Sequence, residues 1–293
     1  MPSTGDGGDP GRVISWRHID PLSENTRYRK VGRRLAPLAA RKFPRRFGVF
    51  EIAALGSLEW LRRHLAIINE LERIRRDEGT ESLNVLDFGG ADGSLGRAIR
   101  LYNLERHYRI VTADIEEPGS GVAEAAPYVG YVVLDPAGDL PMAPDTFDVA
   151  VSSDVFEHIP APARPHWAAE LGRVARLGQV HSVPADSTDG RWASTETDRE
   201  FAGWYETAFG VEERWTTEHL AIGAPSIEEL RVVFPGASIG PIVSTRVWLL
   251  TMKAKYGRKG PLDRVRFAAT YLRDYRGIEL RPPFKNALIV LLR

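Results

Sequence analysis

A glycine-rich turn beside a carboxylate is the first feature of this sequence that could do chemistry. Gly89, Gly90 and Gly93 follow Asp87 closely within the run VLDFGGADGSLG, residues 85–96. Glycines let a backbone approach a ligand closely, and the start of a following helix offers that ligand unpaired N–H groups. A carboxylate here would repel a pyrophosphate and attract a cation. The run therefore predicts a site for a nucleotide-like ligand that carries positive charge.

Two more aspartates stand at the ends of apolar runs. Asp114 ends the second run and lies 21 residues after Gly93. In doubly wound folds an acid about 20 residues beyond the glycine turn accepts hydrogen bonds from ribose hydroxyls. The spacing predicts that Asp114 binds a ribose, with Ile115 beside it. Asp135 closes the third apolar run in the same way.

Histidine is the first candidate for a general base, because its unperturbed pKa lies nearest neutral pH. His158 follows a fourth apolar run, His181 lies within a fifth, and His219 stands beside Glu218, which could orient its imidazole. His158 and His181 also suit supporting roles. Asp154 is the remaining candidate, and with His158 and another carboxylate it would offer ligands to a divalent cation. The sequence leaves both the base and the metal open.

A sheet flanked by helices must position these residues, because short apolar runs alternate with stretches of helical periodicity. Helices are expected over 52–74 with Gly79 at the end, over 94–104, over 167–177 with Gly178 at the end, near Trp248, and over 264–275. The expected strands cover 84–88, 108–115, 130–134, 147–152, 179–184, 238–244 and 287–292. Open sheets of parallel strands bind ligands at their carboxyl edge, where the acids and histidines above would lie.

Two motifs resemble those of the class I S-adenosylmethionine-dependent methyltransferases. Residues 87–93 resemble the first motif of that class, [D/E]-x-G-x-G-x-G, with Ala91 in place of one glycine. Residues 139–160, DLPMAPDTFDVAVSSDVFEHIP, resemble the LPFxxxxFDxVxxxxVxEHxP pattern of the same superfamily. The resemblance covers roughly Asn84 to Pro184 and says little about the methyl acceptor.

The resemblance implies S-adenosyl-L-methionine as the cofactor. Asp87 and the backbone of 89–93 would hold its methionine portion, and Asp114 its ribose. Asp135 would accept from the adenine amino group, with Leu134 against the ring. The sulfonium would face the edge formed by Ser153 and Asp154.

The same resemblance implies an α/β fold with a Rossmann-like, seven-stranded, mostly parallel sheet and helices on both faces. We divide the chain into a disordered tail (1–11), a helical basic N-terminal extension (12–80), the cofactor-binding core (81–185), an acidic aromatic lid (186–235) and the C-terminal part of the core (236–293). Nine basic and no acidic residues lie between Arg27 and Arg46. This basic arm is expected to pack across the core or to meet an anionic surface.

The segment from Asp186 to Glu218 differs in composition from the core, since it holds nine acidic residues against three basic ones. Aromatic faces with carboxylate acceptors suit a sugar, whose C–H faces stack on rings and whose hydroxyls donate hydrogen bonds. Each ring could instead belong to the core of a small helical subdomain. Negative charge argues against nucleic acid. The expected substrate-binding residues are Trp192, Trp204, Tyr205, Trp215 and Glu218.

A third stretch, residues 215–230, resembles the W-x-x-E-H-x-x-x-G-x-P-S-x-E-E-L segment of methyltransferases from polysaccharide gene clusters. Ser226 and Glu229 also form a capping box, which by itself predicts the start of a helix. Frequent Arg and Ala with no cysteine suit a high-GC bacterium. We therefore expect O-methylation of a sugar hydroxyl in a glycan or oligosaccharide, for example an actinobacterial polysaccharide precursor such as a mannoside.

Two alternatives stay open: a lipid or quinone acceptor approached through the basic arm, and a methyltransferase-like binding module without activity, suggested by Ala91. The 39 basic and 39 acidic residues cancel, so no global field draws the chain to nucleic acid or membrane. The sequence lacks cysteine and any run of about 18 apolar residues. We expect a cytoplasmic protein with no integral membrane segment, and a homodimer stays one option for its assembly.

Overall fold

The computed structural model describes residues 14–15, 58–117, 127–257, 266–267, 269–270, 273–274 and 281–293. The expected tail (1–11) and basic arm (27–46) lie outside these residues, as does most of the helix expected over 264–275. No described helix is long and apolar enough to cross a membrane.

One mostly parallel sheet forms the centre of the fold, with strands in the order β1-β4-β3-β2-β5-β6-β8-β7. Strands β2 to β6 pair in parallel, whereas β8 is antiparallel to both of its neighbours. The expected seven strands are therefore confirmed, and the two-residue β1 adds an antiparallel edge beside β4. The strands are β1 (Ile14–Ser15), β2 (Leu83–Phe88), β3 (Tyr108–Asp114), β4 (Tyr128–Val133), β5 (Phe147–Ser153), β6 (Ala175–Pro184), β7 (Ser238–Ser244) and β8 (Phe284–Leu292).

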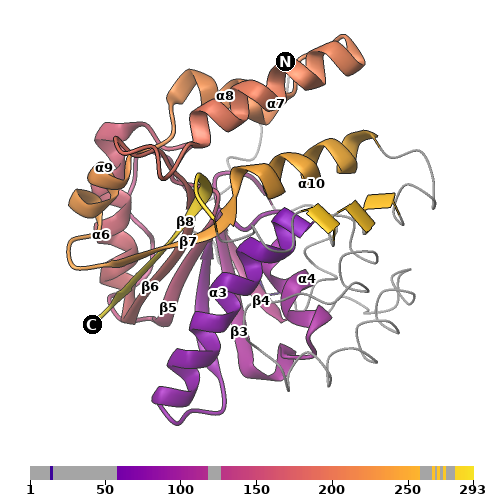
Figure 1. The fold of residues 1–293 in the computed structure, drawn as a ribbon. Helices are drawn as coiled ribbons and strands as arrows, with labels where there is room; N and C mark the ends of the chain where they lie inside the picture. The colour runs from indigo at the N-terminus through magenta and orange to yellow at the C-terminus, as the bar shows by residue number, and fades with distance from the viewer. Residues whose placement is uncertain are drawn as a thin grey trace, which may run out of the picture.

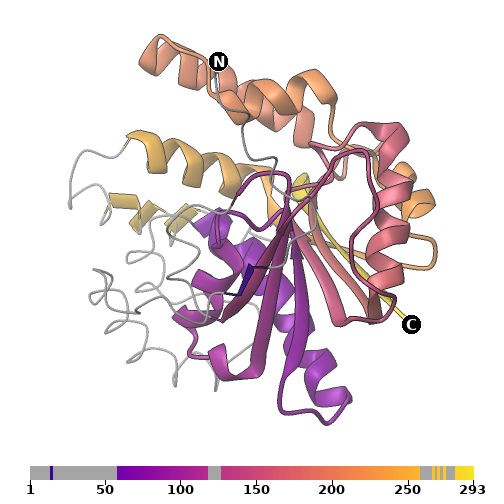
Figure 2. The same cartoon turned by 180° about the vertical axis from the view of Figure 1, so that it is seen from behind.

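Helices cover both faces of this sheet and lie beyond one of its ends. In Figure 1, α3 lies in front of the strands and α7 and α8 form a layer above them, while Figure 2 shows α6 on the opposite face. The α-helices are α3 (Leu58–Asp77), α4 (Ser94–Leu101), α6 (Arg164–Val174), α7 (Ser194–Phe209), α8 (Arg214–Ile222), α9 (Ile227–Val233) and α10 (Thr245–Gly257). The class of fold expected from the sequence, α/β and Rossmann-like, is thus confirmed.

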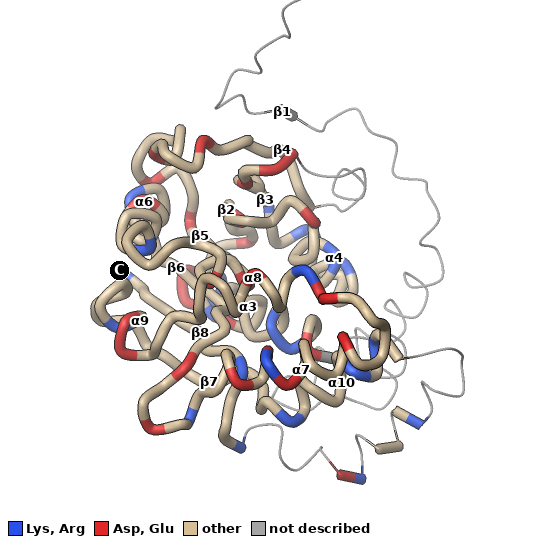
Figure 3. Tube along the Cα trace, turned by 90° about the horizontal axis from the view of Figure 1, so that it is seen from above, with Lys and Arg blue, Asp and Glu red and all other residues tan. Residues whose placement is uncertain are grey.

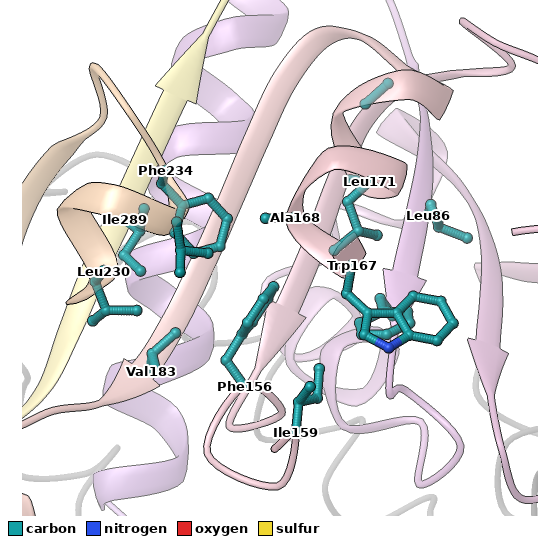
Figure 4. Close-up of a cluster of buried hydrophobic side chains, with 14 of the residues drawn as sticks. Leu86, Phe156, Ile159, Trp167, Ala168, Leu171, Val183, Leu230, Phe234 and Ile289 are labelled. Carbon is teal, nitrogen blue, oxygen red and sulfur yellow. The ribbon is translucent and has the colours of Figure 1, made fainter. Parts of the chain in front are cut away.

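Alternation along the strands places successive apolar side chains in two separate cores. In β2, Leu86 joins the cluster beneath α6 and α9, whereas Val85 joins the cluster beneath α3 and α4. Figure 4 shows the first cluster, where Trp167 and Leu171 of α6 lie on the same side of the sheet as Leu86. Both faces of the sheet are covered by helices, so a ligand can reach the sheet only at the ends of the strands.

Gly178 does not end a helix, as the sequence suggested, but lies inside β6. Helix α6 ends at Val174, and Ala175 is already extended. Gly178 has a φ of +143°, and a Cβ there would overlap the carbonyl oxygen of Leu291 in the neighbouring strand β8. The glycine serves a close approach of two backbones, which sequence periodicity alone does not reveal.

Candidate active site

The glycine turn between β2 and α4 lies at the carboxyl end of the sheet, as expected. Gly89, with φ +75°, donates from its amide to Ala113 O at 2.8 Å and so ties the turn to β3. Gly93, with φ +67°, stands at the N-cap of α4. Both positions need the left-handed conformation that glycine adopts without strain. The turn therefore presents its backbone and the start of α4 at the strand ends.

Asp87 lies beneath this turn and is 4% exposed. Burial raises the pKa of its carboxyl to about 7, although the hydrogen bond from Tyr128 opposes the shift. Tyr128 donates to Asp87 Oδ2 at 2.5 Å. A Cβ at Gly90 would overlap this carboxylate, so the turn fits closely over it. Tyr128 is a member of the site that the sequence analysis missed, because it begins β4, 41 residues away from Asp87.

Asp114 joins the end of β3 to the glycine turn. Its Oδ2 accepts a hydrogen bond of 3.0 Å from the amide of Ala91, and its Oδ1 accepts one of 3.2 Å from Glu116. Ile115 is 60% exposed beside it. An exposed apolar side chain next to a carboxylate offers a nucleoside both a surface for its base and an acceptor for its hydroxyls.

The other expected cofactor residues lie at the ends of β4 and β5. Asp135 is exposed and accepts from the amide of Ala137 at 2.9 Å, while Leu134 is buried in the core below it. The Ser153 hydroxyl is buried and has no hydrogen-bond partner among the described residues. The strand ends expected to hold the cofactor thus form one continuous edge, β4-β3-β2-β5.

The segment Glu157–Pro160 (E-H-I-P), which follows β5, contacts helix α8. His158 and its partner Glu218 are 60 positions apart in the sequence. His158 Nδ1 lies 2.8 Å from Glu218 Oε1, and His158 Nε2 lies 3.1 Å from His219 Nε2. Burial lowers the pKa of His158, against the opposing effect of Glu218. The exposed ring of Trp215 stands edge-on to His158 with 5.6 Å between centroids. Four of the expected catalytic and substrate residues are therefore brought together.

A buried polar chain continues behind His219. His219 Nδ1 lies 3.4 Å from Asp198 Oδ2, which in turn lies 2.6 Å from Lys285 Nζ. Lys285 also donates to Ser194 Oγ at 2.6 Å. Burial opposes ionisation of Asp198, but Lys285 and His219 lower its pKa overall. These contacts join α8 to α7 and β8, and they place a carboxylate near the far nitrogen of His219.

Glu157 completes this cluster from the E-H-I-P segment. It is fully buried, and neither carboxylate oxygen has a hydrogen-bond partner among the described residues. Burial raises the pKa of Glu157 to about 8, although Lys285 and Arg63 lower it. Its Oε1 lies 3.9 Å from His219 Nε2. The sequence analysis quoted Glu157 within a motif without giving it a role.

Asp154 does not pair with His158 as ligands of one cation, which corrects that expectation. The segment after β5 is a turn and not a helix, with His158 N bonded to Val155 O, so a spacing of four does not place the two side chains on one face. Asp154 has a φ of +55°, forms an ion pair with Arg63 and accepts from Asn286 Nδ2 at 2.9 Å. Asp154 thus links β5 to α3 and β8.

His181 lies in the core and does not join the other histidines. It is fully buried, and its two ring nitrogens contact Ser152 Oγ at 2.8 Å and Gln179 Oε1 at 3.0 Å. Burial lowers the pKa of His181 to about 3. Phe156 packs edge-on against its ring at 5.2 Å. This is the supporting role that the sequence left open for His181.

The expected aromatic surface of the lid is divided between core and surface. Trp204 and Tyr205 pack against Phe201, which is fully buried, and Trp192 is 7% exposed against Phe284. Trp192 is therefore buried, and Trp204 and Tyr205 are half-buried against the core, which agrees with the alternative interpretation, while Trp215 is 49% exposed. Figure 3 shows acidic segments of α7 beside basic segments of α10, and Glu200 pairs with Lys253 at 2.8 Å. Part of the lid's negative charge is thereby compensated.

Arg164 holds the E-H-I-P segment in place, a function that the sequence analysis missed. It is 2% exposed and donates from Nε to the carbonyl oxygens of Phe156 and Ile159. Its Nη1 lies 2.6 Å from Glu229 Oε1 and its Nη2 lies 3.1 Å from Gly223 O. Glu229 therefore contacts Arg164 through its side chain, while its amide donates the expected N-cap hydrogen bond to Ser226 Oγ at 3.0 Å.

Residues 86–181 match the family model described as a methyltransferase domain. Over these residues the chain contains a methyltransferase domain. The match agrees with the methyltransferase resemblance of the two motifs, with which S-adenosyl-L-methionine is the expected cofactor. It includes the glycine turn and His158, whereas Glu218 and His219 of the methyltransferase lie beyond it.

Individual relatives are more distant. An uncharacterized methyltransferase of Mycolicibacterium gilvum (strain PYR-GCK) is 29% identical over 156 residues, which cover 53% of this chain and 58% of that protein. The chain thus spans little more than half the length of that relative. Among solved structures, phosphoethanolamine N-methyltransferase 2 of Haemonchus contortus shares 13% identity, with 76% of this chain and 52% of that chain covered and a TM-score of 0.43. The cyclopropane synthase MmaA2 of Mycobacterium tuberculosis shares 14% identity, with 76% and 83% covered and a TM-score of 0.43.

Proposed function

We propose that this methyltransferase transfers a methyl group from S-adenosyl-L-methionine to a hydroxyl oxygen of a sugar in a glycan or oligosaccharide. The observation that carries the proposal is the convergence of His158, Glu218 and His219 beside the exposed ring of Trp215. This cluster stands at the end of β5, next to the strand ends proposed to hold the cofactor.

On the cofactor side, the residues fit a nucleoside with a cationic tail. The amides of the glycine turn and the start of α4 would hold the carboxylate of the methionine portion. Asp114 would accept from the ribose hydroxyls, with Ile115 against the base, and Asp135 would accept from the adenine amino group. The cofactor supplies the sulfonium leaving group when bound. The chain's task is to orient the acceptor oxygen and exclude water.

On the acceptor side, a nitrogen of the histidine pair would take the proton from the acceptor hydroxyl. Burial lowers the pKa of His158, so its imidazole is neutral near pH 7 and able to accept a proton. Glu218 at Nδ1 fixes the ring and stabilises the charge that would develop on it. General base catalysis of this kind contributes roughly 10²–10⁴-fold to a rate. His158 is 25% exposed, so a substrate can reach it.

The choice of a sugar depends on Trp215 and Glu218. Trp215 offers an exposed aromatic face, and Glu218, 36% exposed, offers a carboxylate within the same patch. A ring for the C–H face of a pyranose beside an acceptor for its hydroxyls is an arrangement that suits carbohydrates. A lipid or quinone acceptor is a second candidate, favoured by the exposed Phe209 and Val211 between α7 and α8.

Transfer of a labelled methyl group to a panel of mannose oligosaccharides, quinones and fatty acids tests the proposal. We expect label in the sugar fraction as a methyl ether. His158→Ala should lower kcat by at least 100-fold with little change in cofactor affinity, whereas His166→Ala, on α6 outside the cluster, should leave both unchanged. Label confined to lipids or quinones would replace the sugar by the second acceptor. Cofactor binding by calorimetry with no transfer to any acceptor would favour the inactive binding module.

A further inference from the structure

Three potential ligand atoms face one another at the centre of the candidate active site. His158 Nε2 and His219 Nε2 are 3.1 Å apart, and Glu157 Oε1 lies 3.9 Å from His219 Nε2. One donor atom from each of the three residues lies within 4.8 Å of the other two. Two nitrogens bound to one Zn²⁺ at about 2.0–2.1 Å in tetrahedral geometry would be about 3.3 Å apart. The imidazole pair therefore already has the separation that a shared ion requires.

The outer nitrogen of each imidazole faces a carboxylate. His158 Nδ1 lies 2.8 Å from Glu218 Oε1, and His219 Nδ1 lies 3.4 Å from Asp198 Oδ2. Histidines that bind metals commonly donate their other N–H to a carboxylate, which fixes the tautomer and increases the basicity of the ligating nitrogen. With hydrogens on both Nδ1 atoms, the two Nε2 lone pairs point toward each other. The two lone pairs repel each other unless a proton or a cation lies between the nitrogens.

Glu157 supplies an independent sign that a cation is missing from the cluster. Its carboxylate is fully buried and without a hydrogen-bond partner among the described residues, which is costly for an ionised group. The nearby cations are engaged elsewhere, since Lys285 pairs with Asp198 and Arg63 pairs with Asp154. Among the described residues, the Glu157 carboxyl therefore has no hydrogen-bond donor, and a bound cation would stabilise its ionised form.

We propose that Glu157, His158 and His219 bind a divalent transition-metal ion of the zinc class. Two imidazole nitrogens and one carboxylate oxygen suit Zn²⁺ and its first-row neighbours, whereas Mg²⁺ and Ca²⁺ prefer all-oxygen sites. Three protein ligands leave a fourth position open, as in catalytic zinc sites. This site differs from the pairing of Asp154 with His158 considered from the sequence.

The inference rests on the proposed function for its role and deepens it. In the metal-bound protein the imidazole lone pairs would hold the cation, so the cation would replace His158 as the group that activates the acceptor hydroxyl, which would bind at its open position. Coordination lowers the pKa of that hydroxyl. Its O–H bond breaks with the electron pair left on oxygen, and the proton passes to solvent water. The oxygen then takes the methyl group as the bond from methyl carbon to sulfur breaks and the sulfur keeps that electron pair.

Metal binding can be measured without any enzymatic assay. The full chain, made without a polyhistidine tag and stripped with EDTA, would be titrated with Zn²⁺ by calorimetry and with Co²⁺ by visible absorption. We expect one ion per chain, and a Co²⁺ spectrum typical of mixed nitrogen and oxygen ligands. His219→Ala should weaken binding at least 100-fold, and Glu218→Gln about 10–100-fold through the outer contact. His107→Ala and His166→Ala, which remove histidines outside the cluster, should leave the titration unchanged.

Absence of one-ion binding, or binding that survives in His219→Ala, would overturn the metal site. If His219→Ala fails to fold by circular dichroism, Glu157→Gln decides, because a nearly isosteric amide should weaken the site without emptying the core. Methyl transfer to a sugar in excess EDTA, with no zinc bound, would overturn the metal site and leave the proposed function standing. Stoichiometric zinc binding with no transfer to any hydroxyl would do the reverse.

Discussion

The amide of Ala91 donates a hydrogen bond of 3.0 Å to Asp114 Oδ2, which joins the glycine turn to the end of the neighbouring strand. Ala91 stands where the related motif has a glycine, and its backbone still takes part in the turn. The two elements proposed to bind the cofactor are therefore connected by a hydrogen bond. A substitution in the glycine turn should therefore alter the position of Asp114, and a substitution of Asp114 should alter the turn.

Asp114→Ala should weaken binding of S-adenosylmethionine by about 1–3 kcal/mol, because charged hydrogen bonds to the ribose and the tie to Ala91 are both lost. Calorimetry with the cofactor and with S-adenosylhomocysteine measures this directly. Asp139→Ala, an exposed aspartate with a side chain 76% accessible, serves as the matched control. Equal affinities in the Asp114→Ala variant and the wild type would mean that the ribose lies elsewhere.

Asp87→Asn should change how stability depends on pH. The folded-state pKa of Asp87 is raised from 3.8 to about 7, so the folded protein binds the extra proton between these values. Its contribution therefore favours folding at low pH and is lost as pH rises toward 7. Asn cannot ionise but can still accept from Tyr128. The variant should gain on the wild type as pH rises from 4 to 7, by about 4 kcal/mol at most. Urea denaturation across this range measures the difference, and a constant difference would contradict the prediction.

Arg164→Met should destabilise the fold by about 3–5 kcal/mol, since it removes a buried charge and its four hydrogen bonds, two to the carbonyl oxygens of Phe156 and Ile159 and one each to Glu229 and Gly223. Glu229→Gln keeps an acceptor for Arg164 and should cost only about 1–2 kcal/mol. Arg231→Met changes an exposed residue of the same helix and should be nearly neutral. Free energies of unfolding from urea titrations would rank the three variants. A neutral Arg164→Met variant would show that the packing of Phe156 alone holds the segment.

His181→Leu should lower stability without abolishing methyl transfer. The change leaves Ser152 Oγ and Gln179 Oε1 buried without their partner, at a cost of about 1–3 kcal/mol each. Thermal unfolding should show the loss, while kcat measured well below the melting temperature should stay within about threefold of the wild type. A loss of activity in a folded variant, comparable to that of His158→Ala, would give His181 a direct part in the chemistry.

The strands and their ligand-facing ends were predictable because each is a local pattern. Strand β7 covers 238–244 as expected, and Asp114 and Ser153 stand at the ends of their strands. Turn chemistry was predictable for the same reason, since glycines at positions of positive φ leave a mark in a few adjacent residues. The prediction that Gly178 ends a helix was wrong, because in the sequence a glycine at a close contact between two backbones looks the same as a glycine at a helix end.

The contacts that assemble the acceptor side were not predictable from local pattern. His158 meets Glu218 and His219 across about 60 residues, and Lys285 meets Asp198 across 87. The sequence shows that a residue is acidic or basic, but it does not show which residue it contacts in the fold. Trp204 and Tyr205 show the same limit, because an aromatic residue in a polar segment fits a core or a binding face equally well until its neighbours are known.

Strand β8 lies between β6 and β7 and brings Lys285 and Asn286 against Asp198 and Asp154. During translation, β7 therefore has no neighbour to pair with until residues 284–292 leave the ribosome. Before that moment the nascent chain exposes the edges of two strands, Asp198 lacks Lys285 and Asp154 lacks Asn286. Completion of the sheet and of the buried contacts behind the acceptor side thus become one late event, so a chain stalled on the ribosome before residue 284 would lack both.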